Sequence, residues 1–385
     1  MSAGRARRRA RRWAAAVGAV VALVVVWATL VPSGRVALRT AFFLPDLMPP
    51  VTVRPLTWVT PAPRRSEVRI ADAGAGWAAD LYVPPGGGPM PAVIVSLGIN
   101  QAARDDPRVR KLGDGLARLG FVVLIPANDD LRAERLTPDA VAMLVAAFQH
   151  LAARPGVDPA RIGYFGVCIG ASLALLAAED EAIAADVAWV AWFGGYHRLD
   201  TLVAAVVSRS QPQPEGACRR DAACPPPGTI VPWAVDPMSE RVVRAALAAL
   251  VAPAAGGPGG ADDGAAAARA RLERGATHDE ALRALASLPP AARAQLAALS
   301  PATRLAALRA PLYTMSDVGD PLVPSSETDA LNRDAAALGR LARARTFDVF
   351  SHVNLDPFAD PARTLPEVWR LYRHVHAIVA QALLD

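Results

Sequence analysis

The feature that most constrains this chain is a cysteine flanked by glycines where a strand is predicted to meet a helix. Residues 161–165 (RIGYF) resemble a buried strand, residues 166–170 are Gly-Val-Cys-Ile-Gly, and residues 169–178 have the composition of a buried helix. Glycines on both sides of Cys168 let a strained turn close against its neighbours. A helix N-terminus favours a thiolate. The pattern predicts a nucleophilic Cys168 on a tight turn; the alternative is an inert cysteine among packing glycines.

Strand-like and helix-like patterns alternate along residues 63–385. Short apolar runs such as residues 92–97 (AVIVSL) and 121–125 (FVVLI) have the length and composition of strands buried on both faces. Such alternation indicates an α/β fold, a doubly wound and mostly parallel sheet with helices on both faces. The predicted strands are residues 67–71, 76–83, 92–97, 121–125, 161–165, 186–193, 311–315 and 346–350, and the predicted helices are residues 108–119, 137–152, 169–178, 327–342 and 365–384.

A long insertion, residues 200–308, interrupts this alternation. It contains a Pro-rich stretch at 211–227, a Gly/Ala-rich stretch at 253–264, and several segments rich in Ala, Leu and Arg that favour helices. An insertion between two strands of such a sheet is expected to form a helical cap over the carboxyl ends of the strands, where these folds bind ligands. A loosely ordered decoration is the alternative.

Residues that could activate the thiol follow two later strands. A free thiol is only a few per cent ionised at about pH 7, so Cys168 needs a base. Asp320 follows one predicted strand, in the run Asp-Pro-Leu-Val-Pro, and His352 follows the next. Nucleophile, acid and histidine, each just beyond a different strand, stand in the order of a hydrolase triad. His352 is predicted to take the thiol proton, and Asp320, with Asp317 in reserve, to orient the imidazole.

These motifs together resemble the α/β-hydrolase superfamily. They are the strand 92–97 with Gly98, the elbow 166–170, Asp320 with its Pro-Leu-Val-Pro run, and His352. The cysteine in the elbow resembles the dienelactone hydrolase branch, which uses a Cys-Asp-His triad. The resemblance covers roughly residues 65–200 and 305–385, so it implies one hydrolase domain over residues 63–385 with the cap inserted.

The resemblance also implies an oxyanion hole and no cofactor. The backbone amide of Ile169 is one expected donor, and the turn after Gly98 is expected to supply a second, from Ile99 or Asn100. The usual His-Gly-Gly pattern is absent, and Gly98-Ile99-Asn100 replaces it. The position three before the acid is often Gly in such proteins and here is Asp317. Compact family members also lack a membrane anchor and so long an insertion.

The N-terminus has the pattern of an exported, anchored protein. Residues 1–12 form a basic tail with six arginines, and residues 13–31 are nineteen residues without a charge. That length, about 28 Å as a helix, suits a transmembrane anchor with a cytoplasmic N-terminus. A cleaved signal peptide is the alternative, which would give a secreted protein. Both place the catalytic domain outside the cytoplasm, and residues 32–62 are predicted to be a Pro-rich linker.

The net charge and the two cysteines of the insertion bear on possible partners and cross-links. Without the six N-terminal arginines the formal charge of +5 falls close to zero, so a nucleic-acid partner is not expected. Cys218 and Cys224 are predicted to form a short-loop disulfide, with two free thiols as the alternative. A metal site is not expected there, because no nearby His or Cys completes a set of four ligands.

The sequence therefore predicts a hydrolase that acts on a small-molecule ester, lactone or thioester through an acyl-cysteine intermediate. One alternative is an acyltransferase that uses the same acyl-cysteine. The other is a catalytically silent, membrane-anchored binding protein. The presence of all three triad residues counts against that last alternative.

Overall fold

The computed structural model describes residues 13, 18–19, 22–23, 26–48, 51–71, 76–99, 106–215, 225–250, 268, 270–351, 354–355 and 360–384. Of the predicted anchor, residues 13–31, positions 14–17, 20–21 and 24–25 lie outside these ranges. Among the described residues, no helix is both long enough and apolar enough to cross a membrane.

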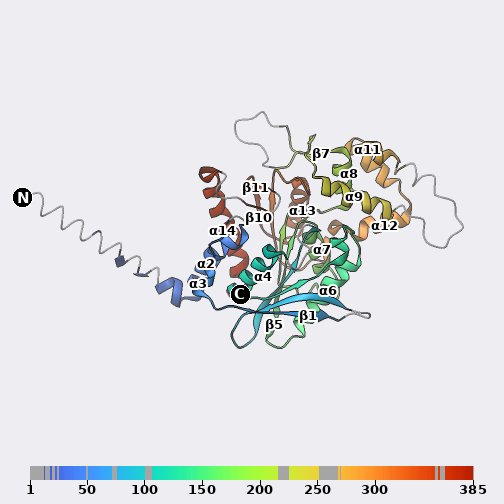
Figure 1. Ribbon diagram of the computed structural model, residues 1–385. Coiled ribbons are helices and arrows are strands. Elements are labelled where there is room, and N and C mark those ends of the chain that lie inside the picture. The colour runs from blue at the N-terminus through green and yellow to red at the C-terminus, as the bar shows by residue number, and fades with distance from the viewer. Residues whose placement is uncertain are drawn as a thin grey trace, which may run out of the picture.

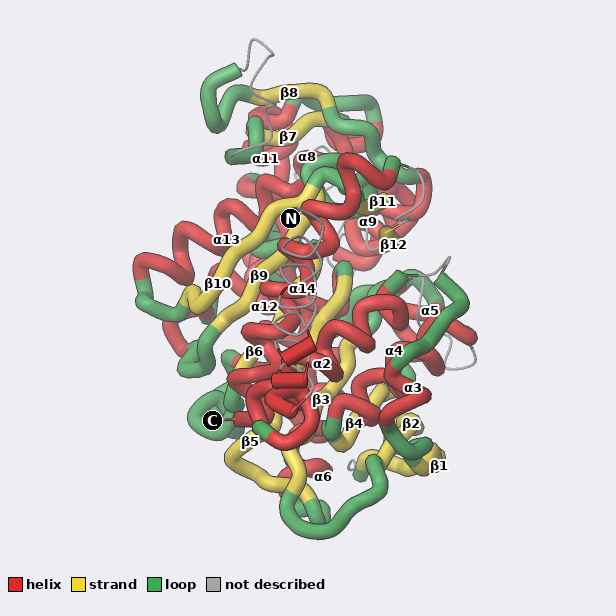
Figure 2. Tube along the Cα trace, turned by 90° about the vertical axis from the view of Figure 1, so that its left-hand side faces the viewer, coloured by secondary structure: helices red, strands yellow, loops and turns green. Residues whose placement is uncertain are grey.

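An eight-stranded sheet forms the centre of the fold, in the order β1-β2-β4-β3-β5-β6-β9-β10 (Figures 1 and 2). Strand β2 is antiparallel to both of its neighbours, and all other pairs are parallel. The mostly parallel α/β sheet predicted from the sequence is therefore confirmed. The strands are β1 Arg64–Ile70, β2 Trp77–Val83, β3 Met90–Ser96, β4 Val122–Pro126, β5 Val157–Val167, β6 Trp189–Phe193, β9 Leu312–Asp317 and β10 Leu341–Phe347.

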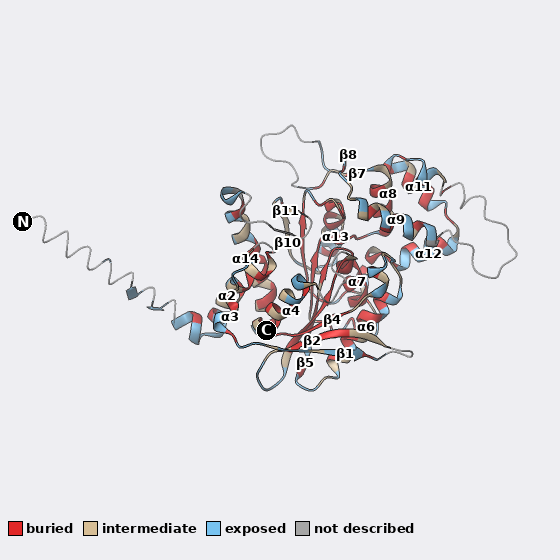
Figure 3. Cartoon of the chain, in the orientation of Figure 1, coloured by how far each residue is buried: buried red, intermediate tan, exposed pale blue. Residues whose placement is uncertain are grey.

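Helices cover both faces of the sheet, and each face has its own hydrophobic core. We call one the α7 face; it is covered by α6 (Asp139–Ala152), α7 (Ile169–Ala178) and α13 (Ser325–Ala337). The other is the α14 face, covered by α2 (Pro32–Phe43), α4 (Pro107–Leu119) and α14 (Pro361–Leu384). Because successive side chains of a strand point to opposite faces, the inner strands β3, β4 and β6 are almost entirely apolar, and Figure 3 shows them almost entirely buried.

The segment predicted as a Pro-rich linker, residues 32–62, packs on the domain over its described parts, 32–48 and 51–62. Prolines begin its helices instead of preventing them: Pro32 occupies the first turn of α2, and Pro45 that of η1 (Leu44–Leu47). The side chain of Phe43 is 2% exposed. Lys111 of α4 donates from Nζ to the carbonyls of Pro45, Met48 and Val51 at 2.9, 3.3 and 2.8 Å, and so fixes the segment. The short helix α3 is Leu56–Val59.

The last strand of the sheet begins earlier than predicted. The pattern suggested a helix over residues 327–342 and a strand over 346–350, whereas α13 ends at Ala337 and β10 is Leu341–Phe347. Gly339 has a φ of +67°, a left-handed conformation that ends the helix.

The described part of the insertion is largely helical and lies at one end of the sheet (Figure 1). Its helices are α8 Leu199–Ser208, α9 Pro237–Leu250, α11 His278–Ala286 and α12 Pro290–Ala298, followed by the short helices η3 Pro301–Thr303 and η4 Leu305–Ala307. A small ribbon, β7 Ser210–Pro212 with β8 Ile230–Pro232, was not predicted. The remaining elements are α5 Asp129–Arg132, β11 Phe350–Ser351 and β12 Asn354–Leu355.

Candidate active site

Cys168 occupies the sharp turn that the sequence predicts. It is the residue between the last residue of β5 and the first of α7, with φ of 57° and ψ of −140°. A non-glycine residue in this region carries strain of about 1–3 kcal/mol. The turn is held by neighbouring strands, since the Cys168 N–H donates to the carbonyl of Phe193 at 2.8 Å. The side chain is 8% exposed.

The glycines flanking Cys168 are required by close backbone contacts. A β-carbon on Gly166 would lie 2.3 Å from Cα of Ala171, and one on Gly170 would lie 2.4 Å from the carbonyl oxygen of Ser96. Neither position can accept a side chain without a backbone shift. The two glycines therefore allow α7 to begin directly behind Cys168 and against the end of β3.

A third glycine brings the turn after β3 onto the thiol. A β-carbon on Gly98 would lie 2.6 Å from Cβ and 3.1 Å from Sγ of Cys168. The backbone of this turn and the start of α7 thus both lie beside Cys168, which is where the predicted oxyanion hole would have to form. Ile99 is partly buried, and Asn100 lies outside the described residues.

Asp317 ends β9, and both of its carboxylate oxygens accept backbone N–H groups. Oδ1 accepts from Gly319 at 2.9 Å and Oδ2 accepts from Phe350 at 2.8 Å. The side chain is buried, and this burial raises the pKa of Asp317 to about 6 against the opposing effect of the backbone N–H donors. The carboxylate joins the end of β9 to the segment that leads to His352.

Asp320 lies in the turn that follows, also buried. Its Oδ1 accepts from the backbone N–H groups of Leu322 and Val323 at 2.8 and 3.1 Å. Its Oδ2 is 3.2 Å from the place where a β-carbon of Gly194 would lie. We call residues 318–324 the acid turn, after the role predicted for Asp320. Gly194 directly follows Phe193, whose carbonyl accepts the Cys168 N–H, so the elbow and the acid turn meet around the end of β6.

The insertion holds the acid turn from the other side. The indole Nε1–H of Trp233 donates to the carbonyl of Asp320 at 2.8 Å. The Asp236 N–H donates to the carbonyl of Pro321 at 2.8 Å, and the Ser239 hydroxyl donates to that of Leu322 at 2.7 Å. Three consecutive carbonyls of the acid turn therefore accept hydrogen bonds from residues of the insertion.

Three other predicted site residues lie outside the described residues: His352, Cys218 and Cys224. The structure thus brings together Cys168, Ile169, Ile99, Asp317 and Asp320 at the carboxyl end of the sheet. Within the described ranges, no group of three or more His, Cys, Asp or Glu side chains is arranged to hold a metal ion.

A buried polar cluster beside this edge has no clear signal in the sequence. Glu327 of α13 accepts the backbone N–H groups of His197 and Arg198 on one oxygen, both at 2.9 Å. The His197 ring pairs with Asp334 at 2.8 Å. Burial raises the pKa of Glu327 to about 7 and lowers that of His197. The cluster fastens the chain after β6 to the helix that follows the acid turn.

Comparison with known proteins supports the architecture. Residues 78–215 match the Dienelactone hydrolase family, a segment that includes Cys168 and ends before Asp320 and His352. None of the curated proteins compared with the chain matches it.

Two solved structures are similar in fold. A puromycin-hydrolyzing peptidase of Mycobacterium tuberculosis has a TM-score of 0.51 at 16% identity, with 83% of this chain and 39% of the peptidase covered. An uncomplexed acylaminoacyl peptidase of Pyrococcus horikoshii has a TM-score of 0.50 at 12% identity, with 84% and 43% covered. The match spans less than half the length of these peptidases, and at this identity it shows the fold alone.

Proposed function

We propose that this chain, which carries a dienelactone hydrolase family domain over residues 78–215, hydrolyses a carboxylic ester, lactone or thioester through Cys168. The observation that carries the proposal is the strained conformation of Cys168 with Gly98 packed against its sulfur. Strain of this kind persists where the surroundings impose it, and it clusters at catalytic sites.

The reaction follows from the groups that surround the thiol. His352 takes the proton of Cys168, and the sulfur attacks the carbonyl carbon of the substrate. The oxyanion that forms accepts hydrogen bonds from the amides of Ile169 and of Ile99 or Asn100. Collapse breaks the bond to the leaving group, which receives the proton from His352. Water, deprotonated by His352, then attacks the acyl-cysteine and releases the acid and the thiol.

Asp320 is our choice for the acid that orients His352, and its surroundings support this. Both oxygens of Asp317 bind backbone amides, one of which belongs to Phe350, two residues before His352. Asp317 is thus suited to position the segment that carries the histidine. Asp320 lies buried in the turn after β9, its Oδ1 held by the backbone N–H groups of Leu322 and Val323, and this turn meets the end of β6 at Gly194, next to the elbow.

Alkylation tests the nucleophile directly. The purified protein is treated with iodoacetamide between pH 5 and 9 and the modified cysteine is mapped, with His352→Ala alongside. Fast labelling of Cys168 well below about pH 8, lost in the histidine variant, is the expected result. Slow labelling whose pH dependence gives a thiol pKa near about 8.5, and which is unchanged in His352→Ala, would overturn the proposal.

Turnover supplies the second readout. Cys168→Ala is expected to abolish hydrolysis of p-nitrophenyl acetate, whereas Cys168→Ser keeps a small fraction because a hydroxyl needs stronger activation. Unchanged activity of the alanine variant would remove Cys168 from the mechanism. Circular dichroism of both variants checks that the fold is intact.

We further propose that residues 13–31 anchor the domain outside the cytoplasm. The basic tail and the uncharged stretch support this, and α2, which begins at Pro32 and packs on α14, would follow the anchor without a linker. Mass spectrometry of the mature N-terminus tests it: a start near Thr29 would mean a cleaved signal peptide.

A further inference from the structure

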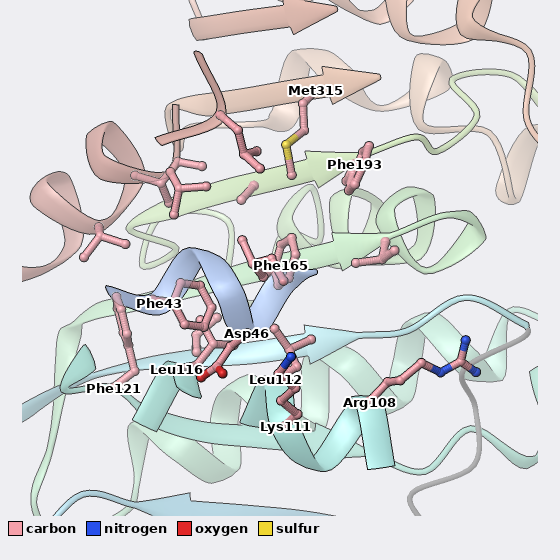
Figure 4. A pocket seen from close by; sticks show the side chains of 18 of the residues that line it. Phe43, Asp46, Arg108, Lys111, Leu112, Leu116, Phe121, Phe165, Phe193 and Met315 are labelled. Atoms are coloured by element: carbon pink, nitrogen blue, oxygen red, sulfur yellow. The ribbon is translucent and has the colours of Figure 1, made fainter. Parts of the chain in front are cut away.

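A cavity of about 280 Å³ lies within the α14 face, between the sheet and the helices that cover it. Its walls come from the end of α2 and η1, from α4 and α14, and from strands β3, β5, β6 and β9. Figure 4 shows Phe43 on one side, and Phe165, Phe193 and Met315 from the strands on the other. The cavity is close to the size of small-molecule sites, about 300–1,000 Å³.

One end of this cavity lies beside the candidate active site. Val167, which lines it, directly precedes Cys168. Phe193, also in the wall, accepts the Cys168 N–H through its carbonyl. Phe350 lines the same end and donates its N–H to Asp317. A group attached to Sγ of Cys168 is therefore close to the end of an apolar space.

The charged side chains in the wall are already engaged. Asp46 is bonded to Arg54 at 2.7 Å, and Lys111 donates to three backbone carbonyls. Arg108 is paired with Asp106. The indole of Trp189 lies over Gly163, with Nε1 2.6 Å from where a β-carbon on that glycine would be, and among the described residues this buried N–H has no hydrogen-bond partner. A ligand inside gains no partner for a charge, because burying one unpaired is costly. The occupant is therefore apolar.

The dimensions indicate an extended chain. Trp189, Ala191 and Phe193 of β6 all line the cavity, and four steps along a strand span about 13 Å. On α14 the lining extends from Leu371 to Val379, about 12 Å along a helix. Extended hydrocarbon advances about 1.3 Å per carbon, because bonds of about 1.5 Å follow a zigzag. The space matches about eight to ten carbons.

We propose that this cavity binds the hydrocarbon chain of the acyl group, about eight to ten carbons long, while its carbonyl reacts at Cys168. The substrate class is then a medium-chain acyl ester or thioester. The proposal rests on the proposed function, since it takes Cys168 as the residue that carries the acyl group. Each buried methylene is expected to improve kcat/KM about fourfold until the cavity is filled.

Kinetics with p-nitrophenyl esters from acetate to hexadecanoate test the chain length. The expected profile rises to octanoate or decanoate and then falls. Ala191→Phe puts a ring in the middle of the cavity and should lower the ratio of decanoate to acetate kcat/KM at least tenfold. The matched control is Ala142→Phe, an exposed alanine of α6 on the other face of the sheet, which should leave the ratio unchanged.

Binding without turnover separates the two proposals. Calorimetry of the Cys168→Ala protein with decan-1-ol should give binding that Ala191→Phe abolishes and Ala142→Phe preserves. Activity that is equal from acetate to decanoate, with no decan-1-ol bound, would overturn the cavity assignment and leave the hydrolase function in place. Failure to cleave any ester, with decan-1-ol still bound, would overturn the hydrolase function and with it the assignment of the chain as an acyl chain.

Discussion

The two faces of the sheet differ in how tightly they are packed. On the α7 face every residue of α7 is buried, and glycines let backbones approach within distances that no side chain permits. On the α14 face larger side chains, among them Phe121, Trp189 and Phe193, enclose an empty space of about 280 Å³. The difference teaches that one sheet can be densely packed behind the proposed nucleophile on one side and keep a cavity, the proposed acyl site, on the other.

The strongest test asks which aspartate at the end of β9 belongs to the catalytic machinery. Asp317 is two residues after Met315, so the two side chains lie on the same side of the strand, the α14 face of the sheet. Asp320→Asn should lower kcat for p-nitrophenyl acetate about 10³- to 10⁴-fold, as loss of a triad acid does. Asp317→Asn should lower it about tenfold, because one carboxamide oxygen still accepts a backbone amide. The opposite ranking would exchange the roles of the two residues.

The tight packing of the α7 face is tested by Gly170→Ala. The added methyl group meets the carbonyl oxygens of Ser96 and Leu97 at 2.4 and 2.5 Å, so the free energy of unfolding should fall by about 3 kcal/mol. Urea denaturation gives the value. Gly87→Ala is the control, since nothing lies within 4 Å of that position. A loss below about 1 kcal/mol at Gly170 would show that the contact relaxes easily.

A matched pair of substitutions compares the faces directly. Ala174 of α7 is fully buried in the dense core, and Ala191 lines the cavity. Ala174→Leu should lower the free energy of unfolding by about 2–3 kcal/mol through overpacking. Ala191→Leu should leave it unchanged or raise it, because the new methyl groups occupy empty space. Equal losses in thermal or urea denaturation would contradict the contrast between the faces.

The smallest expected effect concerns pH and the buried carboxyl at the rim of the α7 face. Burial raises the pKa of Glu327 from 4.5 to about 7, so the native state holds this proton more tightly than the unfolded chain. The stabilising contribution is complete below about pH 4.5 and is lost as the pH rises to about 7. The wild-type protein should lose about 2.5 kcal/mol of stability from this group between pH 5 and 8, and Glu327→Gln should remove that loss. Identical pH profiles of the melting temperature for both proteins would refute this.

The central sheet and the elbow were predictable because their signals are local. Runs such as residues 92–97 and 121–125 are apolar on both faces, and they coincide with β3 and β4 within two residues at each end. The glycine pattern around Cys168 requires a conformation that few residues adopt, so it predicts the turn correctly.

The rest depended on contacts that the sequence does not contain. Residues 341–347 (LARARTF) are rich in helix formers, and only the parallel pairing with β9 makes them a strand. The prolines of residues 32–62 suggested a linker because the partner surfaces on α4 and α14 were unknown. Whether Asp317 binds backbone amides, and whether a cavity remains under α14, depends on segments far apart in the chain.

The bonds from Trp233, Asp236 and Ser239 to the acid turn make the insertion inseparable from the domain it interrupts. A shortened version of the protein that joined residue 199 directly to residue 309 would leave the carbonyls of Asp320, Pro321 and Leu322 without these donors. Attempts to trim the insertion should therefore yield a folded sheet in which Asp320, the proposed acid, is displaced. Exchanging the cap for that of another protein would succeed only if the replacement supplied three donors at the same places.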